Sequence, residues 1–174
     1  MALTIRPATP ADCARLAEIY APAVTHGTTS FELVAPDTEE MARRMRTLTK
    51  AGFPYLAAER GGGVIGYAYA SPYRARPAYR YTVENSVYVA AEAQRGGVGR
   101  ALLTALIDAC TARGYRQMIA VIGDSPNQPG SIGLHRACGF VEVGRLPDVG
   151  YKFGCWLDSL LMQRALGAGG KSSP

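Results

Sequence analysis

Residues 94 to 100 read Gln94-Arg95-Gly96-Gly97-Val98-Gly99-Arg100 and join a β-rich run that ends near Val89 to a strongly periodic helix. Glycines let the backbone come close to an anion, and the N–H groups at a helix N-terminus favour phosphate because the helix dipole lies behind them. The segment lacks the GxxxxGK(S/T) pattern of a Walker A loop, and Leu102 stands where a GxGxxG dinucleotide fingerprint needs its third glycine. It predicts a cradle for pyrophosphate, with a plain glycine turn before a helix as the alternative.

Strand and helix patterns on both sides of this segment predict an α+β protein. Val98 to Arg113 carries apolar residues at helical spacing and is followed by Gly114, a typical C-cap. Asp37 is expected to cap an earlier helix, with Glu40 as its capping-box partner. Sequence patterns predict two further helices, over 10–24 and 131–138. Alternation and turn residues predict seven strands, over 3–6, 55–60, 64–70, 81–89, 118–122, 140–144 and 156–163. We therefore expect a mixed, mostly antiparallel sheet of about seven strands flanked by about four helices.

The composition is that of an ordinary globular protein. With 174 residues, 48% of them hydrophobic and 19% charged, the chain is long enough for one buried core. Residues 1–166 are expected to form a single domain and residues 167–174 a flexible tail. Charged residues interrupt any apolar run among the first twenty, so we expect no signal peptide, no membrane contact and a cytoplasmic location.

Charge and cysteine content narrow the classes of ligand. The net charge is +5, but no block of five or six like charges occurs, which favours small anionic ligands over nucleic acid. The four cysteines are widely spaced and form no CxxC pair. We therefore expect no metal site and no disulfide framework.

Motifs across the chain give a more specific indication. Gln94, Gly97 and Gly99 match the Q/R-x-x-G-x-G/A acetyl-CoA motif of the GNAT superfamily, in the same strand-loop-helix context. Residues 82–89, 120–125 and 134–140 resemble the phosphinothricin and methionine sulfoximine N-acetyltransferase branch, and the resemblance spans about residues 3 to 166. It implies a GNAT-like fold, acetyl-CoA as cosubstrate without a metal, and direct acetyl transfer to the amino group of a small, amino-acid-like acceptor. It also implies a homodimer.

The resemblance assigns the cofactor-binding residues by position. The backbone of Val87, Tyr88 and Val89 would bind the pantetheine arm and the thioester carbonyl, where a fixed N–H stabilises the oxyanion of the transition state. Asn127 would bind the pantetheine arm, although eight positions separate it from His135 where the family usually has seven. The pyrophosphate would lie against Gln94, Arg95, Gly96, Gly97, Val98, Gly99 and Arg100.

Glu84 is the candidate general base, because an ammonium acceptor must lose a proton before it attacks a thioester. Side chains alternate along a strand, so Glu84, Ser86 and Tyr88 share one face while Asn85 and Val87 share the other. A glutamate in a partly desolvated cleft has a raised pKa that suits such a transfer. An ordinary surface glutamate is the alternative.

His135 is the second catalytic candidate. It occupies the position where many GNAT enzymes have a tyrosine that protonates the departing CoA thiolate, and imidazole can do the same. The alternative is a half-buried histidine that a backbone group satisfies. Cys138 lies three residues later, but no third group orients it as a nucleophile, so we interpret it as a core residue.

The stretch from Tyr73 to Tyr81 is the candidate acceptor-binding loop, since it holds three arginines and no acid. Arginine matches carboxylate or phosphinate oxygens, and the resemblance places Arg76 and Tyr79 at the acceptor. We also expect Arg74 there, with Phe31 closing the pocket from the other side. An exposed loop or a nucleic-acid platform are the alternatives. Other acceptors, such as a peptide N-terminus, an aminoglycoside or a polyamine, also stay open. So does a non-catalytic acyl-CoA sensor, which would need neither Glu84 nor His135.

Overall fold

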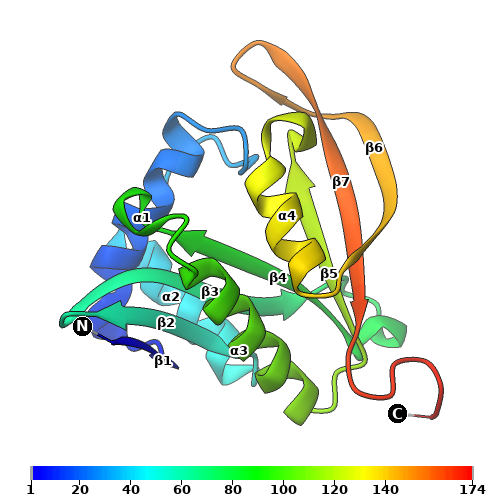
Figure 1. Cartoon of the computed structure of the whole chain (residues 1–174). Coiled ribbons are helices and arrows are strands. Elements are labelled where there is room, and N and C mark those ends of the chain that lie inside the picture. The colour runs from blue at the N-terminus through cyan, green and yellow to red at the C-terminus, as the bar shows by residue number, and fades with distance from the viewer. Residues whose placement is uncertain (1, 174) are drawn as a thin grey trace.

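The computed structural model describes residues 2–173, and within them the chain forms one seven-stranded sheet with four α-helices (Figure 1). The strands follow the order β1-β2-β3-β4-β5-β7-β6 across the sheet. The strands are β1 (Leu3–Pro7), β2 (Tyr55–Arg60), β3 (Gly63–Pro72), β4 (Thr82–Val89), β5 (Gln117–Gly123), β6 (Val141–Lys152) and β7 (Cys155–Ala165). The helices are α1 (Cys13–Thr25), α2 (Thr38–Lys50), α3 (Val98–Ala112) and α4 (Pro129–Ala137). The predicted α+β class is confirmed.

Every neighbouring pair of strands is antiparallel except β4 and β5, which run parallel. The chain joins these two strands through α3, the crossover connection that a parallel pair requires. The sheet is therefore mixed and mostly antiparallel, as predicted from the hairpins and the single strand-helix-strand unit.

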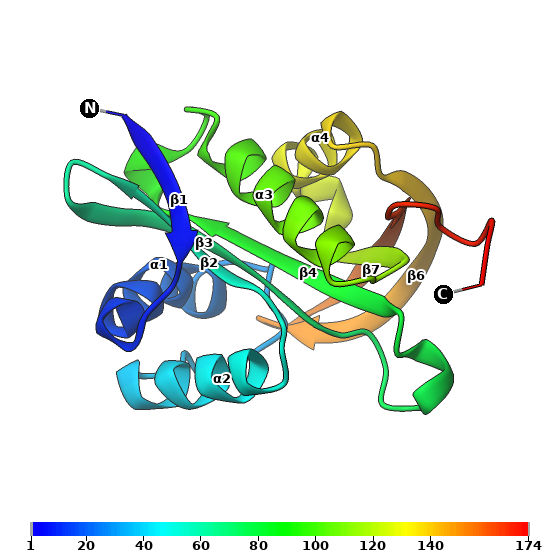
Figure 2. The ribbon, with the colours of Figure 1, turned by 90° about the horizontal axis from the view of Figure 1, so that it is seen from below.

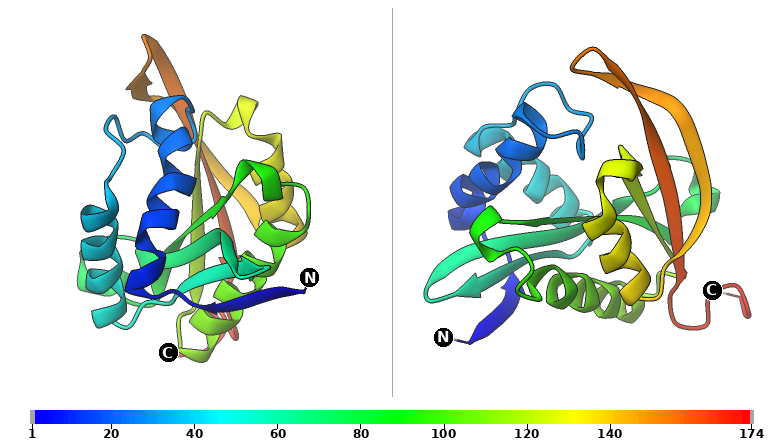
Figure 3. Two further views of the ribbon diagram at one scale, coloured as in Figure 1. Left: turned by 90° about the vertical axis from the view of Figure 1, so that its left-hand side faces the viewer. Right: turned by 45° about the horizontal axis from the view of Figure 1, so that its top comes forward.

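Strand β6 is much longer than the predicted 140–144, because it runs on to Lys152. Gly144, Pro147 and Gly150 interrupt the alternation that a sequence pattern needs, but register shifts after Glu142 and after Leu146 let the strand continue through them. The resulting β6–β7 hairpin extends past the rest of the sheet in both panels of Figure 3.

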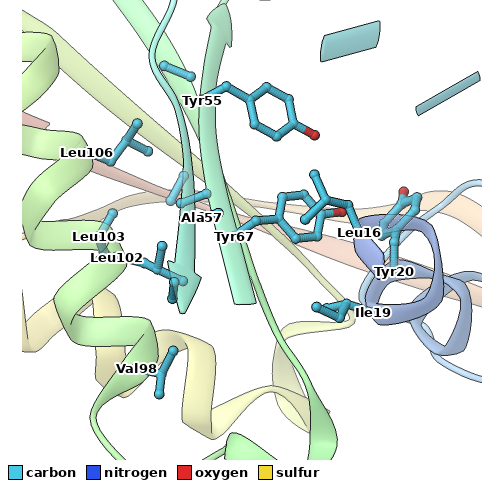
Figure 4. Packing of buried hydrophobic residues seen from close by; sticks show 14 of the residues in the cluster. Leu16, Ile19, Tyr20, Tyr55, Ala57, Tyr67, Val98, Leu102, Leu103 and Leu106 are labelled. Atoms are coloured by element: carbon cyan, nitrogen blue, oxygen red, sulfur yellow. The ribbon is translucent and has the colours of Figure 1, made fainter. Parts of the chain in front are cut away.

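The helices cover the sheet on both faces. Figure 2 shows α1 and α2 on one side, with α3 and α4 on the other. The core lies between these layers: Leu102, Leu103 and Leu106 of α3 pack on one face of β2 and β3, and Leu16 and Tyr20 of α1 pack on the opposite side (Figure 4).

The start of α2 follows the prediction only in part. Asp37 caps the helix and accepts a hydrogen bond from the backbone N–H of Glu40 (2.8 Å). The predicted return bond from the Glu40 carboxylate is replaced by contacts with Arg43 and Arg44, each at 2.6–2.7 Å. Arg44 also binds Glu32 (2.7 Å), so it ties α2 to the preceding loop and is not simply solvated.

The C-terminal residues pack back on the sheet at two points. Leu166 is buried, and Arg116 donates hydrogen bonds to the hydroxyl of Ser172 (2.9 Å) and the carbonyl of Ser173 (2.7 Å). Flexibility of the whole tail stays a prediction, and Pro174 lies outside the described residues.

Substituting Leu102→Ala should lower the free energy of unfolding by about 2–5 kcal/mol, because its side chain is fully buried under α3 and leaves a cavity. Denaturant unfolding measures the change. Leu33→Ala makes the same chemical change at a residue that is 72% exposed and should have little effect. Equal losses in the two variants would contradict this position of the core.

Candidate active site

The central feature of the site is the separation of β4 from β5. The two strands pair at Thr82↔Gln117, Val83↔Met118 and Glu84↔Ile119. Beyond that point β4 stays with β3 as far as Val89, while β5 stays with β7 as far as Gly123. Their arrowheads diverge in Figure 1. The gap opens into a cleft of about 1040 Å³.

Most of the predicted site residues line this cleft. They come from the loop before α2, from β4, from the glycine-rich loop and from the segment around α4: Phe31, Glu84, Val87, Tyr88, Val89, Gln94, Arg95, Gly97, Gly99, Arg100, Asn127 and His135. Val98 is buried under α3, and Gly96 is exposed outside the lining. Arg74, Arg76 and Tyr79 also lie outside it.

The glycine-rich loop ends at the N-terminus of α3. Gly97 is the N-cap with a positive φ of 79°, a conformation that glycine adopts without strain. The first helical turn closes with the bond from Ala101 N–H to the Gly97 carbonyl (3.0 Å), so the amides of the preceding turn have no intrahelical acceptor. Gln94 donates to the carbonyl of Val89 (3.3 Å) and connects the loop to the end of β4. These amides at the mouth of the cleft fit the pyrophosphate of a coenzyme A group.

Glu84 is the half-buried acid of the cleft. Burial raises the pKa of its carboxyl group above the usual value, and the positive charge of Arg74 opposes that rise. Glu84 is also the last residue of β4 that pairs with β5, so its backbone is fixed by strands on both sides. A rigid acid with a raised pKa is suited to general base work near neutral pH.

His135 is buried on α4, and partners occupy both of its ring nitrogens. Nδ1 lies 2.8 Å from the carbonyl oxygen of Ser131, and Nε2 lies 3.1 Å from Oδ1 of Asn85. Burial lowers the pKa of the ring, and the Ser131 carbonyl partly offsets this. The role of acid toward a CoA thiolate stays a prediction, and it would require one of the two contacts to open.

Asn127 uses its side-chain N–H groups within the protein. It donates to both carboxylate oxygens of Asp124 (3.0 Å each), and Asp124 also accepts from the hydroxyl of Thr28. The predicted contact of Asn127 with a pantetheine arm would therefore use its carbonyl oxygen or replace one of these bonds.

Phe31 lies in a slot between two glycines that the sequence did not single out. A Cβ on Gly123 or on Gly150 would overlap the Phe31 ring. Lys152 fixes the same loop, because its buried ammonium donates to the carbonyls of Gly27 (2.8 Å) and Ser30 (2.7 Å). No sequence pattern indicated this anchor, because Lys152 lies outside the predicted strands and its burial is visible only in the fold.

The loop from Tyr73 to Tyr81 is exposed and lies between β3 and β4. The guanidinium of Arg74 lies 5.1 Å from the ring centre of Tyr73, and the rings of Tyr73 and Tyr79 are perpendicular at 5.7 Å. The positive charge of Arg74 lowers the pKa of Glu84, against the effect of burial, but the side chain of Arg74 does not line the cleft. Acceptor binding by Arg74, Arg76 and Tyr79 stays a prediction.

Two further observations concern the described residues, 2–173. No group of three or more His, Cys, Asp or Glu side chains there could hold a metal ion, and none of their helices is long and apolar enough to cross a membrane. Cys138 is 6% exposed and packs in the core, which confirms its interpretation as a core residue.

The cleft has backbone N–H groups suited to phosphate at its mouth and a half-buried carboxylate at its closed end. An enzyme that transfers an acyl group from coenzyme A to an amine needs both. Residues 15–140 match the model of the Acetyltransferase (GNAT) family. The chain belongs to that family and is an N-acetyltransferase that uses acetyl-CoA.

Its relatives cover nearly the whole chain. It is 51% identical to a phosphinothricin N-acetyltransferase of Alcaligenes faecalis, over 99% of this chain and 87% of that protein. It is 40% identical to an L-methionine sulfoximine/L-methionine sulfone acetyltransferase of Salmonella typhimurium, over 94% of this chain and 95% of that protein. A crystal structure of a phosphinothricin acetyltransferase from Sinorhizobium meliloti in complex with acetyl-CoA superposes with a TM-score of 0.96 at 48% identity, covering 100% of this chain and 94% of that one.

Substituting Gly150→Ala should push the Phe31 ring out of its slot toward the cleft, at a cost on the order of 1–3 kcal/mol of overpacking. We expect the KM for the acceptor to rise while the KM for acetyl-CoA changes little, as steady-state kinetics would show. Gly144→Ala is the matched control on β6, because a Cβ there meets open space. Wild-type kinetics in Gly150→Ala would contradict the placement of Phe31 as a wall of the acceptor site.

Proposed function

We propose that the protein acetylates the amino group of a small, amino-acid-like acceptor that carries an anionic or strongly polar side group, of the phosphinothricin, methionine sulfoximine or methionine sulfone type. The observation that carries this proposal is the half-buried Glu84 at the closed end of the cleft, opposite the phosphate-binding loop. The names of the relatives support the acceptor class.

In the proposed reaction, the carboxylate of Glu84 takes a proton from the ammonium group of the acceptor, directly or through one water. The free amine then attacks the thioester carbonyl carbon, the C–N bond forms, and the C–S bond breaks to release CoA thiolate. Backbone groups of Val87 to Val89 line the cleft where β4 has left β5, so they are available to hold the pantetheine arm and the carbonyl oxygen. A fixed donor at that oxygen stabilises the transition state more than the ground state.

The test of the proposal is CoA thiol release from acetyl-CoA with methionine sulfoximine, methionine sulfone, phosphinothricin, a polyamine, an aminoglycoside and a short peptide. Turnover of the amino-acid analogues is expected, with a kcat about 10²- to 10⁴-fold lower in Glu84→Gln. Glu92→Gln is the control, because Glu92 is exposed and paired with Arg15 outside the lining of the cleft. Turnover of polyamine or peptide alone would overturn the acceptor class. Binding of acetyl-CoA without turnover would favour a sensor.

The pH profile gives a second test of Glu84. Its carboxyl pKa is raised, so the deprotonated base is lost as the pH falls through a value above 4.5. We expect kcat/KM of the wild type to fall on the acidic side with an apparent pKa above 4.5, and this limb to be absent in Glu84→Gln. A limb that persists unchanged in the variant would assign it to another group.

We further propose that the protein is a homodimer with the acceptor pocket near the interface. Strand β6 is the edge of the sheet, and the β6–β7 hairpin exposes a set of large apolar side chains: Val141, Val143, Leu146, Val149, Tyr151, Phe153 and Trp156. A long apolar edge of this kind is typical of a protein interface. A second copy would cover it and would help to close the acceptor pocket.

Sedimentation equilibrium tests the dimer. Trp156→Glu places a charge in the apolar hairpin, at a residue that is 65% exposed, and should convert the dimer to monomer. Thr104→Glu adds the same charge on the exposed surface of α3 and should leave the mass unchanged. A wild-type monomer would contradict the proposal without affecting the assignment of Glu84.

A cytoplasmic location is also part of the proposal. All four cysteines are free thiols and Cys155 is exposed, which is typical of proteins from a reducing compartment.

A further inference from the structure

Asn85 lies at the point where β4 and β5 separate. It directly follows Glu84, the last residue of β4 that pairs with β5, and it is 7% exposed. Its side-chain Nδ2 donates to the backbone carbonyl of Ile119 on β5 (3.0 Å). A side-chain amide therefore continues the connection between the two strands immediately beyond their last backbone pair.

The orientation of this amide follows from its partners. A backbone carbonyl only accepts hydrogen bonds, so the Ile119 carbonyl requires the N–H side of Asn85, and Oδ1 turns to the opposite side. There Oδ1 lies 3.1 Å from Nε2 of His135, which must donate if the contact is a hydrogen bond. The Ser131 carbonyl oxygen, which also only accepts hydrogen bonds, lies 2.8 Å from Nδ1. Both nitrogens of His135 thus face acceptors, but burial lowers the pKa of the ring and a neutral imidazole carries one N–H. The contact with Asn85 uses the tautomer with its hydrogen on Nε2.

We propose that Asn85 is a positioning residue that acts through His135, and that the two side chains form a fixed bridge from β5 across β4 to α4 at the closed end of the cleft. The inference rests on the proposed function, because it assigns a role within the same site. It makes His135 part of the support of the cleft, and the CoA thiolate then takes its proton from water.

The contacts with Asn85 and Ser131 are the main polar contacts of His135. The edge of the ring packs at right angles to Phe140, with the ring centres 5.0 Å apart. Glu84 precedes Asn85 on β4, but its side chain points to the other face of the sheet. The exposed Arg136 pairs with Glu142. Within residues 2–173 no carboxylate forms an ion pair with His135.

Two variants of His135 separate a bridge from a proton donor. Glutamine can place an N–H where Nε2 donates to Asn85, but it does not titrate. We expect His135→Gln to keep kcat within about threefold of the wild type, with an unchanged pH profile. In His135→Ala, kcat should fall by at least about tenfold, but by less than the 10²- to 10⁴-fold that is typical of a lost acid or base. His26→Gln, at the exposed second histidine, is the matched control. Equal losses in the glutamine and alanine variants would overturn the proposal.

A spectroscopic measurement tests the bridge without using activity. The chain has two histidines, so ¹⁵N spectra of the histidine-labelled protein report His135 against His26 as an internal reference. In the wild type, Nε2 of His135 should carry a hydrogen, and Asn85→Ala should change its ¹⁵N shift while His26 does not move. A His135 spectrum that is unchanged in Asn85→Ala would refute the bridge. Absence of acetyl transfer by the wild type would instead refute the proposed function.

Discussion

Strands β4 and β5 run parallel, pair over three positions, and then part because each continues with a different antiparallel neighbour. A parallel pair needs a crossover helix, and α3 is that helix. Its N-terminus follows the carboxyl end of β4, so the unpaired amides of its first turn come to lie at the mouth of the opening. The position of the glycine-rich loop and the cleft are thus two consequences of one arrangement of strands.

The alternation of side chains on β4 divides the chemistry between the two faces of the sheet. Glu84 and Asn85 are neighbours in the chain, yet one is the half-buried acid of the cleft and the other reaches toward α4. Because both lie at the last paired position of β4 or directly after it, the strand holds them rigidly. Precise placement of such groups depends on the surrounding backbone more than on their own side-chain freedom.

The wall of the cleft that carries Phe31 is built from segments that lie far apart in the sequence. Residues 26–36 have no regular structure of their own, and their position depends on partners far along the sequence. Lys152 binds two carbonyls of this loop, Asp124 binds Thr28, and Gly150 leaves the space that the Phe31 ring fills. A buried ammonium with carbonyl partners is stable only where such a loop encloses it, so loop and hairpin stabilise each other.

Local patterns in the sequence determined the class of fold, the seven strands, the helix that begins at Val98 and the glycine-rich loop before it, because periodicity and glycine placement act over a few residues. The family resemblance named Glu84 and His135 as candidates, and both line one cleft. The tertiary structure alone decided the full length of β6, the slot for Phe31, the anchor at Lys152 and the contact of His135 with Asn85, 50 residues away. Each of these depends on which strands become neighbours, and hydrogen bonds between distant segments leave no periodic signal in the chain.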